Sequence, residues 1–407
     1  MTSILNKSKM QDFIDIERTL VSDNNSKFFN LLESYIPVRK HTIPSSTECY
    51  DWKVPNKWEV YKCTVMDSNG NIIINSKDNI LHLLNYSNSY KGRIELAELE
   101  KHLYYDKNNP DVIPYRTSYY SENWGICLSY NQNKKLTDEY YYIDIETDKP
   151  PGEMIIGVST LQGKSDKEII LTSYYCHPNQ ANDGMSGVFL LIELYNKLKE
   201  LELKYTYKFF FWPETIGCIG ALHSKLITPH NTEYALVCTT VGVGSKVTYK
   251  QTFIGNHTLD NIIKDRDDVD VIKEFKPTGS DERQLSSKHI RIPTGVLTLT
   301  PYEDYPEYHT SADNIDLLQL DQLEYMSSLY LDTILSYNRS CEPFLTKYNM
   351  YRTIGTPGNT SDELLRNWIL FYADGTKTIK DISKLSGYSE HQVADYIDKL
   401  KQRGVIE

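Results

Sequence analysis

The sequence predicts an α/β protein with a mixed, mainly parallel sheet and helices on both faces, extended by an inserted mostly β domain and a C-terminal winged helix-turn-helix. Three observations predict this class. Apolar runs of strand length alternate with segments of helical periodicity over residues 153–335. Short apolar runs separated by turn signals occupy residues 52–149. Three helical segments follow near the end of the chain.

The α/β part is predicted from strands and helices that alternate along the chain. The expected strands are 154–159, 168–175, 205–212, 234–240 and 295–300, and the expected helices are 186–201, 216–226, 259–264 and 320–337. Strands that alternate with helices pair mainly in parallel. Residues 8–35 also read as helical, with a break near Asn24 and Asn25. We therefore assign residues 1–50 and 150–340 to one α/β domain.

Residues 51–149, called the insert below, are expected to form a mostly β domain with one short helix near 96–103. Residues 36–52, just before it, are expected to be irregular because Pro37 and Pro44 prevent a long helix. Large aromatic side chains dominate protein cores. The core of the insert is therefore expected to contain its main aromatic residues, Trp58, Tyr115, Tyr119, Tyr120 and Trp124.

Residues 345–407 are predicted to form the winged helix-turn-helix, with helices at 364–372, 378–385 and 389–403. Such folds often bind DNA, and a protein that neutralises DNA phosphates needs surplus positive charge. The stretch from Asp362 to Glu407 instead carries eight acidic and seven basic residues. We therefore expect protein contact, possible homo-oligomerisation included, and do not expect nucleic acid as a partner.

Composition sets broader limits on function. The 407 residues carry a net charge of −11, which argues against a broad basic face for nucleic acid or anionic membranes. No apolar run in the sequence is long enough to span a bilayer, and the first residues, MTSILNKSKMQDF, lack the apolar core expected of a secretion signal. Its seven cysteines are scattered without a CxxC pattern, as is typical of reduced thiols. A cytoplasmic location is expected.

The first candidate site lies in EIILTSYYCHPNQANDGMSG, residues 168–187. His177 follows an apolar strand that Pro178 ends, and Asp183 precedes a helix. In open α/β sheets ligands bind outside the carboxyl ends of the strands. An imidazole and a carboxylate there can share a zinc ion. The alternative is a helix cap at Asp183 beside an ordinary histidine.

Two later segments add residues of the same chemistry. Glu214 follows the apolar strand FFFWP, and His309 lies in the polar loop YPEYHTSADN before a helix. Strand-end positions would bring both side chains toward His177 and Asp183. Each also has an ordinary structural reading, since Glu214 can favour a helix start and His309 can be a packed or capping histidine. The aromatic rings of Tyr305 and Tyr308 suggest a wall beside His309.

CHPNQANDGMSG, PETIGCIGA and YHTSADN resemble the signature segments of the zinc aminopeptidase superfamily, which includes bacterial leucyl aminopeptidases and, more distantly, glutaminyl cyclases. WKVPNKW, IPYRTSYYSENWGICL and GSDERQ resemble one bacterial group within it, which has an inserted β domain and a C-terminal winged helix and is sometimes labelled as polysaccharide-biosynthesis proteins. The resemblance implies a zinc-exopeptidase-like fold. It implies that His177, Asp183 and His309 bind metal and that Glu214 is the general base.

Two positions depart from the superfamily pattern. Thr215 stands where a glutamate ligand usually follows the base, and Thr240 lies in CTTVGVG, where an aspartate ligand is usual. Three ligands can still hold one zinc with an open coordination position, so one ion per chain is expected. The resemblance also places Asp281, Glu282 and Arg283 in a loop facing the site, where they could bind a substrate ammonium or carboxylate. A solvated charge run is the other reading.

The expected function is zinc-dependent hydrolysis of an amide bond in a peptide or peptide-like small substrate, similar to that of an aminopeptidase. Two alternatives remain. One is a catalytically degenerate peptidase fold that serves as a binding or regulatory protein, suggested by Thr215, Thr240 and the winged helix. The other is a zinc-dependent acyl-transfer or cyclase enzyme.

Overall fold

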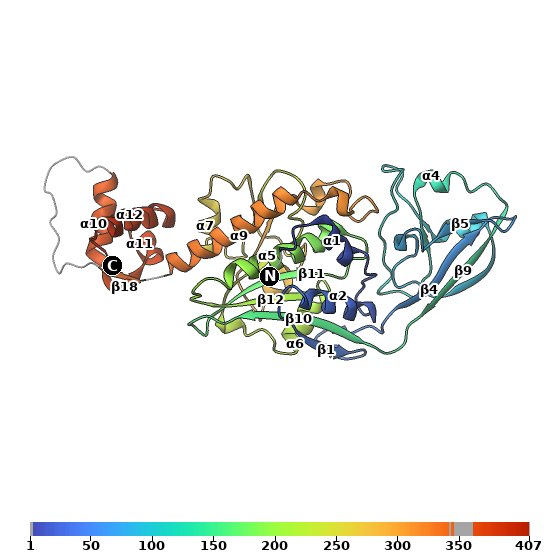
Figure 1. Ribbon diagram of the computed structural model, residues 1–407, viewed down its shortest axis with the longest axis horizontal. Helices are drawn as coiled ribbons and strands as arrows, with labels where there is room; N and C mark the ends of the chain where they lie inside the picture. The colour runs from blue at the N-terminus through green and yellow to red at the C-terminus, as the bar shows by residue number, and fades with distance from the viewer. Residues whose placement is uncertain (1–2, 342, 346–360, 407) are drawn as a thin grey trace.

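The computed structural model describes residues 3–341, 343–345 and 361–406. Its three parts lie in a row (Figure 1), with the α/β part in the middle. The insert lies at one end. The C-terminal helices α10 (Ser361–Tyr372), α11 (Ile379–Ser386) and α12 (Glu390–Gln402) lie at the other. The predicted fold class is confirmed.

An eight-stranded sheet forms the centre of the α/β part. In spatial order its strands are β1 (Arg39–Pro44), β10 (Glu153–Leu161), β12 (Thr206–Trp212), β11 (Glu168–Tyr174), β13 (Thr232–Val237), β16 (Thr294–Thr298), β14 (Thr248–Lys250) and β15 (Val271–Lys273). The run from β12 to β16 is parallel. The pairs β1–β10, β10–β12 and β14–β16 are antiparallel, and the edge pair β14–β15 is parallel. The sheet is therefore mixed, with a parallel centre.

The irregular structure expected for residues 36–52 is wrong in part. Strand β1 pairs with β10 from Arg39 opposite Val158 to Pro44 opposite Glu153. Pro44 is tolerated there because β1 is an edge strand and proline lacks only the main-chain donor. In the sequence, β1 precedes the insert and β10 follows it. Because the two strands pair, both ends of the insert connect to neighbouring strands on the same side of the sheet.

Strand alternation sends side chains to two separate cores. In β11, Ile169 and Leu171 join one apolar cluster, while Ile170 joins the other. The first cluster is covered by α1 (Lys7–Ile14), α2 (Asn24–Glu33), α5 (Ser186–Leu198), α7 (Thr258–Lys264) and α9 (Leu320–Ser340). The second includes residues of α6 (Ile216–His223) and α8 (Glu282–Leu285). Helices thus cover both faces.

The insert contains a four-stranded antiparallel sheet in the order β5 (Ile72–Asn75), β4 (Glu59–Met66), β9 (Tyr140–Asp148) and β6 (Tyr90–Glu95). Shorter elements in and near it are β2 (Glu48–Cys49), β3 (Trp52–Lys53), α3 (Leu96–Leu99), β7 (Leu103–Tyr104), β8 (Ile126–Cys127) and α4 (Tyr130–Asn133). Trp58 and Tyr115 are buried, and Trp124 and Tyr119 are partly buried. The core position expected for Tyr120 is wrong, because 79% of this residue is exposed.

The C-terminal helices share a small core that includes Ile369, Ile382 and Val393. Two short strands, β17 (Pro343–Leu345) and β18 (Asp374–Thr378), pair beside them. Arg339 at the end of α9 forms a 2.5 Å ion pair with Asp398 of α12. Residues 346–360 of the predicted 345–407 domain lie outside the described residues. Within the described part of the chain, no helix is both long and apolar enough to cross a membrane.

Short 3₁₀ helices complete the connections: η1 (Ile80–His82), η2 (Glu100–His102), η4 (Pro229–Asn231), η5 (Tyr302–Asp304) and η6 (Ile315–Leu317).

Candidate metal centre

Loops at one edge of the sheet carry the candidate residues. His177 lies three residues after β11, and Glu214 lies two residues after β12. Asp183 lies in the irregular turn η3 (Ala181–Met185) that leads into α5. His309 lies between η5 and η6. Because β11 and β12 are parallel neighbours, their carboxyl ends bring His177 and Glu214 to the same edge of the sheet.

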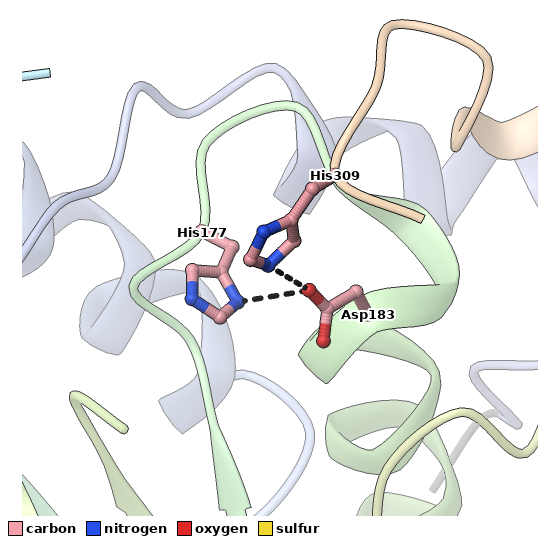
Figure 2. Close-up of side chains that lie close together, drawn as sticks. All are labelled: His177, Asp183 and His309. Carbon is pink, nitrogen blue, oxygen red and sulfur yellow. Dashed lines mark ion pairs between the residues drawn. The ribbon is translucent and has the colours of Figure 1, made fainter. Parts of the chain in front are cut away.

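Two imidazoles converge on one carboxylate oxygen (Figure 2). His309 Nε2 lies 2.9 Å from Asp183 Oδ2, and His177 Nδ1 lies 3.3 Å from the same oxygen. Ligand atoms of the three residues all lie within 4.8 Å of one another. The predicted metal-binding residues are therefore together in space.

The three converging atoms are His177 Nδ1, Asp183 Oδ2 and His309 Nε2. Each is buried, and none has a partner of hydrogen-bond geometry among the described residues. Buried polar atoms that make no hydrogen bond are rare because their desolvation is costly. Two nitrogens and one carboxylate oxygen are a donor set that zinc accepts, with one position left open. The residues present thus fit a zinc ion.

The loop that carries Asp183 is fixed by its own backbone and by Tyr174. Gly184 has φ of 88°, and a Cβ atom there would lie 2.7 Å from the carbonyl oxygen of Tyr174. Glycine is therefore required at this close approach. The Tyr174 hydroxyl donates a 2.5 Å hydrogen bond to Asp183 Oδ1. This bond leaves Oδ2 as the oxygen that faces the imidazoles.

Asp313 anchors the same loop, a role that sequence reasoning missed. Its buried carboxylate accepts main-chain N–H bonds from Ala181, Asn182 and Asp183 at 3.2, 2.6 and 3.0 Å. Tyr305 donates its hydroxyl hydrogen to the same carboxylate at 3.3 Å. Burial raises the pKa of Asp313 to about 7, although the N–H donors favour the ionised form. Its place in the segment YHTSADN, four residues after His309, was the available signal.

Glu214 lies beside the cluster without joining it. One carboxylate oxygen is 3.6 Å from His177 Nε2, and the other accepts a 2.7 Å hydrogen bond from the Ser280 hydroxyl. Burial raises the pKa of Glu214, and the charge of Asp183 adds to this rise, whereas His177 and Ser280 oppose it. A carboxylate with a raised pKa can accept and return a proton near neutral pH.

The pKa values of His177 and Asp183 are shifted in opposite directions. Burial lowers the pKa of His177, but the carboxylates of Asp183 and Glu214 outweigh it, so the pKa lies above its ordinary value. Burial would raise the pKa of Asp183, but the two imidazoles hold it well below its usual range. Asp183 therefore stays ionised, as a metal ligand must.

Thr215, at one of the departing positions, is held in a strained turn. It has φ of 64° and ψ of −64°, and the Ile216 N–H donates to the carbonyl oxygen of Glu214 at 2.7 Å. This three-residue γ-turn is rare, and a β-branched residue at positive φ is an outlier. Such strain persists where surrounding contacts impose it, and it is common at functional sites.

Asp281 and Arg283 provide those contacts. Asp281 is buried, and its carboxylate accepts a 2.7 Å bond from the Thr215 N–H and another of 2.7 Å from Trp212 Nε1. Arg283 Nη2 donates to the Thr215 hydroxyl at 3.1 Å. Both side chains thus position the turn after Glu214, and the substrate contacts predicted for them stay a prediction.

Glu282, the third residue of that group, is buried and lines a cavity of about 840 Å³ beside the cluster. Glu214, Tyr174 and Tyr308 line the same cavity. Thr240, at the second departing position, also lines it and has φ of 50°. The cavity therefore opens directly on the candidate base.

Aromatic rings enclose the imidazoles. Tyr308 stacks on His309 with ring centroids 3.9 Å apart, as the expected aromatic wall requires. Tyr115, from the insert, lies edge-on to both His177 and His309 at 5.5 and 5.2 Å. Sequence reasoning placed Tyr115 in the core of the insert and missed its contact with the site, because 62 residues separate it from His177.

The arrangement of the sheet and its helices matches that of peptidases of the zinc aminopeptidase type. A zinc aminopeptidase from Bacillus subtilis superposes with a TM-score of 0.55 at 13% identity, over 81% of this chain and 93% of that one. This likeness shows the fold and agrees with the resemblance found in the sequence. The protein therefore has a zinc aminopeptidase-like fold.

The chain belongs to the family described as a domain of unknown function, DUF4910, whose profile matches residues 8–339. A winged helix-turn-helix profile matches residues 332–407. A Clostridium acetobutylicum protein is 34% identical over 405 residues, covering 96% of this chain and 93% of that protein. Its provisional name is polysaccharide biosynthesis protein with aminopeptidase-like domain. A crystal structure from the same organism, provisionally described as a peptidase, has a TM-score of 0.88 at 32% identity, covering 99% of this chain and 95% of that one.

Proposed function

We propose that this protein is a zinc-dependent hydrolase of amide bonds with one metal ion per chain, acting in the manner of an aminopeptidase on a peptide or peptide-like small substrate. The observation that carries the proposal is the convergence of three buried ligand atoms, from His177, Asp183 and His309, beside the carboxylate of Glu214. None of the three atoms makes a hydrogen bond of regular geometry within the described part of the chain. If His177 and Asp183 were only a structural pair, the position of His309 and the adjacent cavity would both be unexplained.

His177, Asp183 and His309 would hold the zinc ion. When bound, zinc acts as a Lewis acid that polarises a carbonyl group and lowers the pKa of a water molecule. Glu214 accepts a proton from the attacking water and returns it to the departing amine. Ser280 orients Glu214 through their 2.7 Å hydrogen bond, and the rings of Tyr115 and Tyr308 limit access of bulk water to the imidazoles.

The test compares Glu214→Gln with the unchanged protein after zinc loading. Both are incubated with amino-acid amides, which release ammonia on hydrolysis, and with N-acyl amines, which release a primary amine. Both products are measured together with zinc content. Removal of a general base should lower turnover about 10²- to 10⁴-fold while zinc is retained. Glu324→Gln, at an exposed position of α9, is the matched control and should keep full turnover. Equal turnover in Glu214→Gln, or release of neither ammonia nor amine by the zinc-loaded protein, would contradict the proposal.

A further inference from the structure

The walls of the cavity beside Glu214 are formed mainly by residues that carry hydroxyl or charged groups. Nine of its nineteen lining residues carry a hydroxyl group, and two, Val296 and Pro301, are aliphatic. A pocket for an apolar amino-acid side chain is lined mainly by hydrophobic groups. Its volume of about 840 Å³ is within the range that holds a small organic ligand. These walls instead match a ligand that exchanges many hydrogen bonds.

Two polar atoms of residues that line the cavity lack the hydrogen-bond partners expected for buried polar atoms. Thr298 Oγ1 and Glu282 Oε2 are buried and have no hydrogen-bond partner among the described residues, and the residues are 6% and 1% exposed. The other oxygen of Glu282 forms a 2.7 Å ion pair with Lys250 Nζ. Because the Lys250–Glu282 pair is neutral overall, a neutral hydrogen-bond donor such as a hydroxyl group is the suitable partner for Glu282 Oε2.

Aromatic surface completes the wall. The rings of Tyr302 and Tyr308 lie 5.4 Å apart at the cavity, and Tyr302 is 45% exposed. The C–H face of a sugar ring packs against such aromatic surface, while its hydroxyl groups satisfy polar side chains. A cyclic polyol can pack its C–H face against the tyrosine rings and, at the same time, form hydrogen bonds with the polar atoms that lack partners.

We propose that this cavity binds a polyhydroxylated group, so that the substrate is an amide carried by an amino sugar or a comparable polyol. This inference rests on the proposed hydrolase function for its chemistry. Hydrolysis breaks the carbonyl C–N bond, the carbonyl carbon gains the water oxygen, and the nitrogen gains a proton. The products are a carboxylate and the free amine of the hydroxylated group.

The test measures binding separately from turnover. It uses two probes that carry the same acetamide group on a six-membered ring. N-acetyl-D-glucosamine carries ring hydroxyl groups, whereas N-cyclohexylacetamide has a ring and an amide without them. The zinc-loaded full chain should bind the sugar more tightly in calorimetric or NMR titrations. Thr298→Val removes one partner and should weaken sugar binding about five- to tenfold. It should leave the binding of N-cyclohexylacetamide unchanged.

Thr172→Val is the matched control. Thr172 also lies in a strand of the main sheet with a buried, unpartnered hydroxyl group, but it does not line the cavity. This variant should bind both probes as the unchanged protein does, and urea unfolding checks that both variants fold. The inference is overturned if N-cyclohexylacetamide binds as tightly as the sugar, or if Thr298→Val leaves sugar binding unchanged.

Turnover separates this inference from the proposed function. Cleavage of amino-acid amides without preferential sugar binding would reject the polyol cavity and leave the hydrolase in place. Preferential sugar binding without cleavage of any amide would reject the hydrolase and support the cavity assignment.

Discussion

The main-chain N–H of Tyr115 donates a 2.7 Å hydrogen bond to the carbonyl oxygen of His309. The Ser311 N–H donates to the carbonyl oxygen of Ile113 at 2.8 Å, and Pro114 forms a β-bridge with Thr310. His309 has φ of 53°, a conformation that needs support from its surroundings. The insert therefore holds the loop that presents His309, although that loop belongs to the α/β part.

Tyr115 is expected to position the metal ligands. Tyr115→Ala removes the ring that packs against His177 and His309, and it should lower zinc affinity about tenfold or more, as loss of outer contacts does at other metal sites. Competition with a chromogenic chelator measures the affinity. Tyr120→Ala, at the exposed tyrosine of the same segment, should have no effect. Equal zinc affinity in the two variants would contradict this role.

Asp313 is expected to stabilise the Asp183 loop. Asp313→Asn places an N–H₂ group against main-chain N–H donors, so unpaired buried groups result and the free energy of unfolding should fall by about 1–3 kcal/mol. Urea denaturation measures the change, and zinc affinity should fall with it. The control Asp304→Asn alters a half-exposed surface carboxylate and should change stability little. A fully stable Asp313→Asn would refute the anchoring role.

The pH dependence of turnover should report Glu214. A general base acts in its ionised form, so activity should be lost as pH falls through the raised pKa of Glu214. Ser280→Ala removes a donor that favours the ionised form, and it should therefore move the acid limb of the pH–rate profile to higher pH. Ser328→Ala, on the exposed face of α9, should leave the profile in place. An acid limb that moves to lower pH would be inconsistent with this assignment.

The contribution of Asp281 to the free energy of unfolding should fall as pH rises. Burial raises the pKa of Asp281 to about 7, above its ordinary 3.8 in the unfolded chain. A group with a raised pKa contributes stability that is fully present below the unfolded pKa and is lost as pH rises through the folded one. The stability advantage of the unchanged protein over Asp281→Asn should therefore shrink between about pH 4 and pH 8. Urea unfolding at several pH values tests this, and an advantage that grows with pH would contradict it.

The sequence predicted the fold class and the converging residues because both depend on local patterns. Strand ends marked by Pro178 and Pro213 placed His177 and Glu214 at one sheet edge, as the parallel pairing of β11 and β12 requires. The polar loop before a helix singled out His309, and the resemblance to zinc aminopeptidases, whose fold the comparison supports, gave it the role of a metal ligand.

What sequence reasoning missed depends on contacts between distant segments. Tyr115 and Asp313 act through bonds to loops whose spatial neighbours no periodicity reveals. Strand β1 was missed because Pro37 before it and Pro44 at its end suggest a loop, and because the whole insert separates it from β10 in the sequence. The short strands β14 and β15 are three residues each, too brief for a clear alternation.

The zinc content of the purified chain tests the central claim most directly. After loading with zinc and removal of free metal, the unchanged protein should contain about one zinc ion per chain, since His177, Asp183 and His309 form one ligand set. His177→Ala and His309→Ala should each lose it, whereas His230→Ala, at an exposed position, should keep it. A chain that takes up no zinc, or ligand variants that retain it fully, would contradict the account.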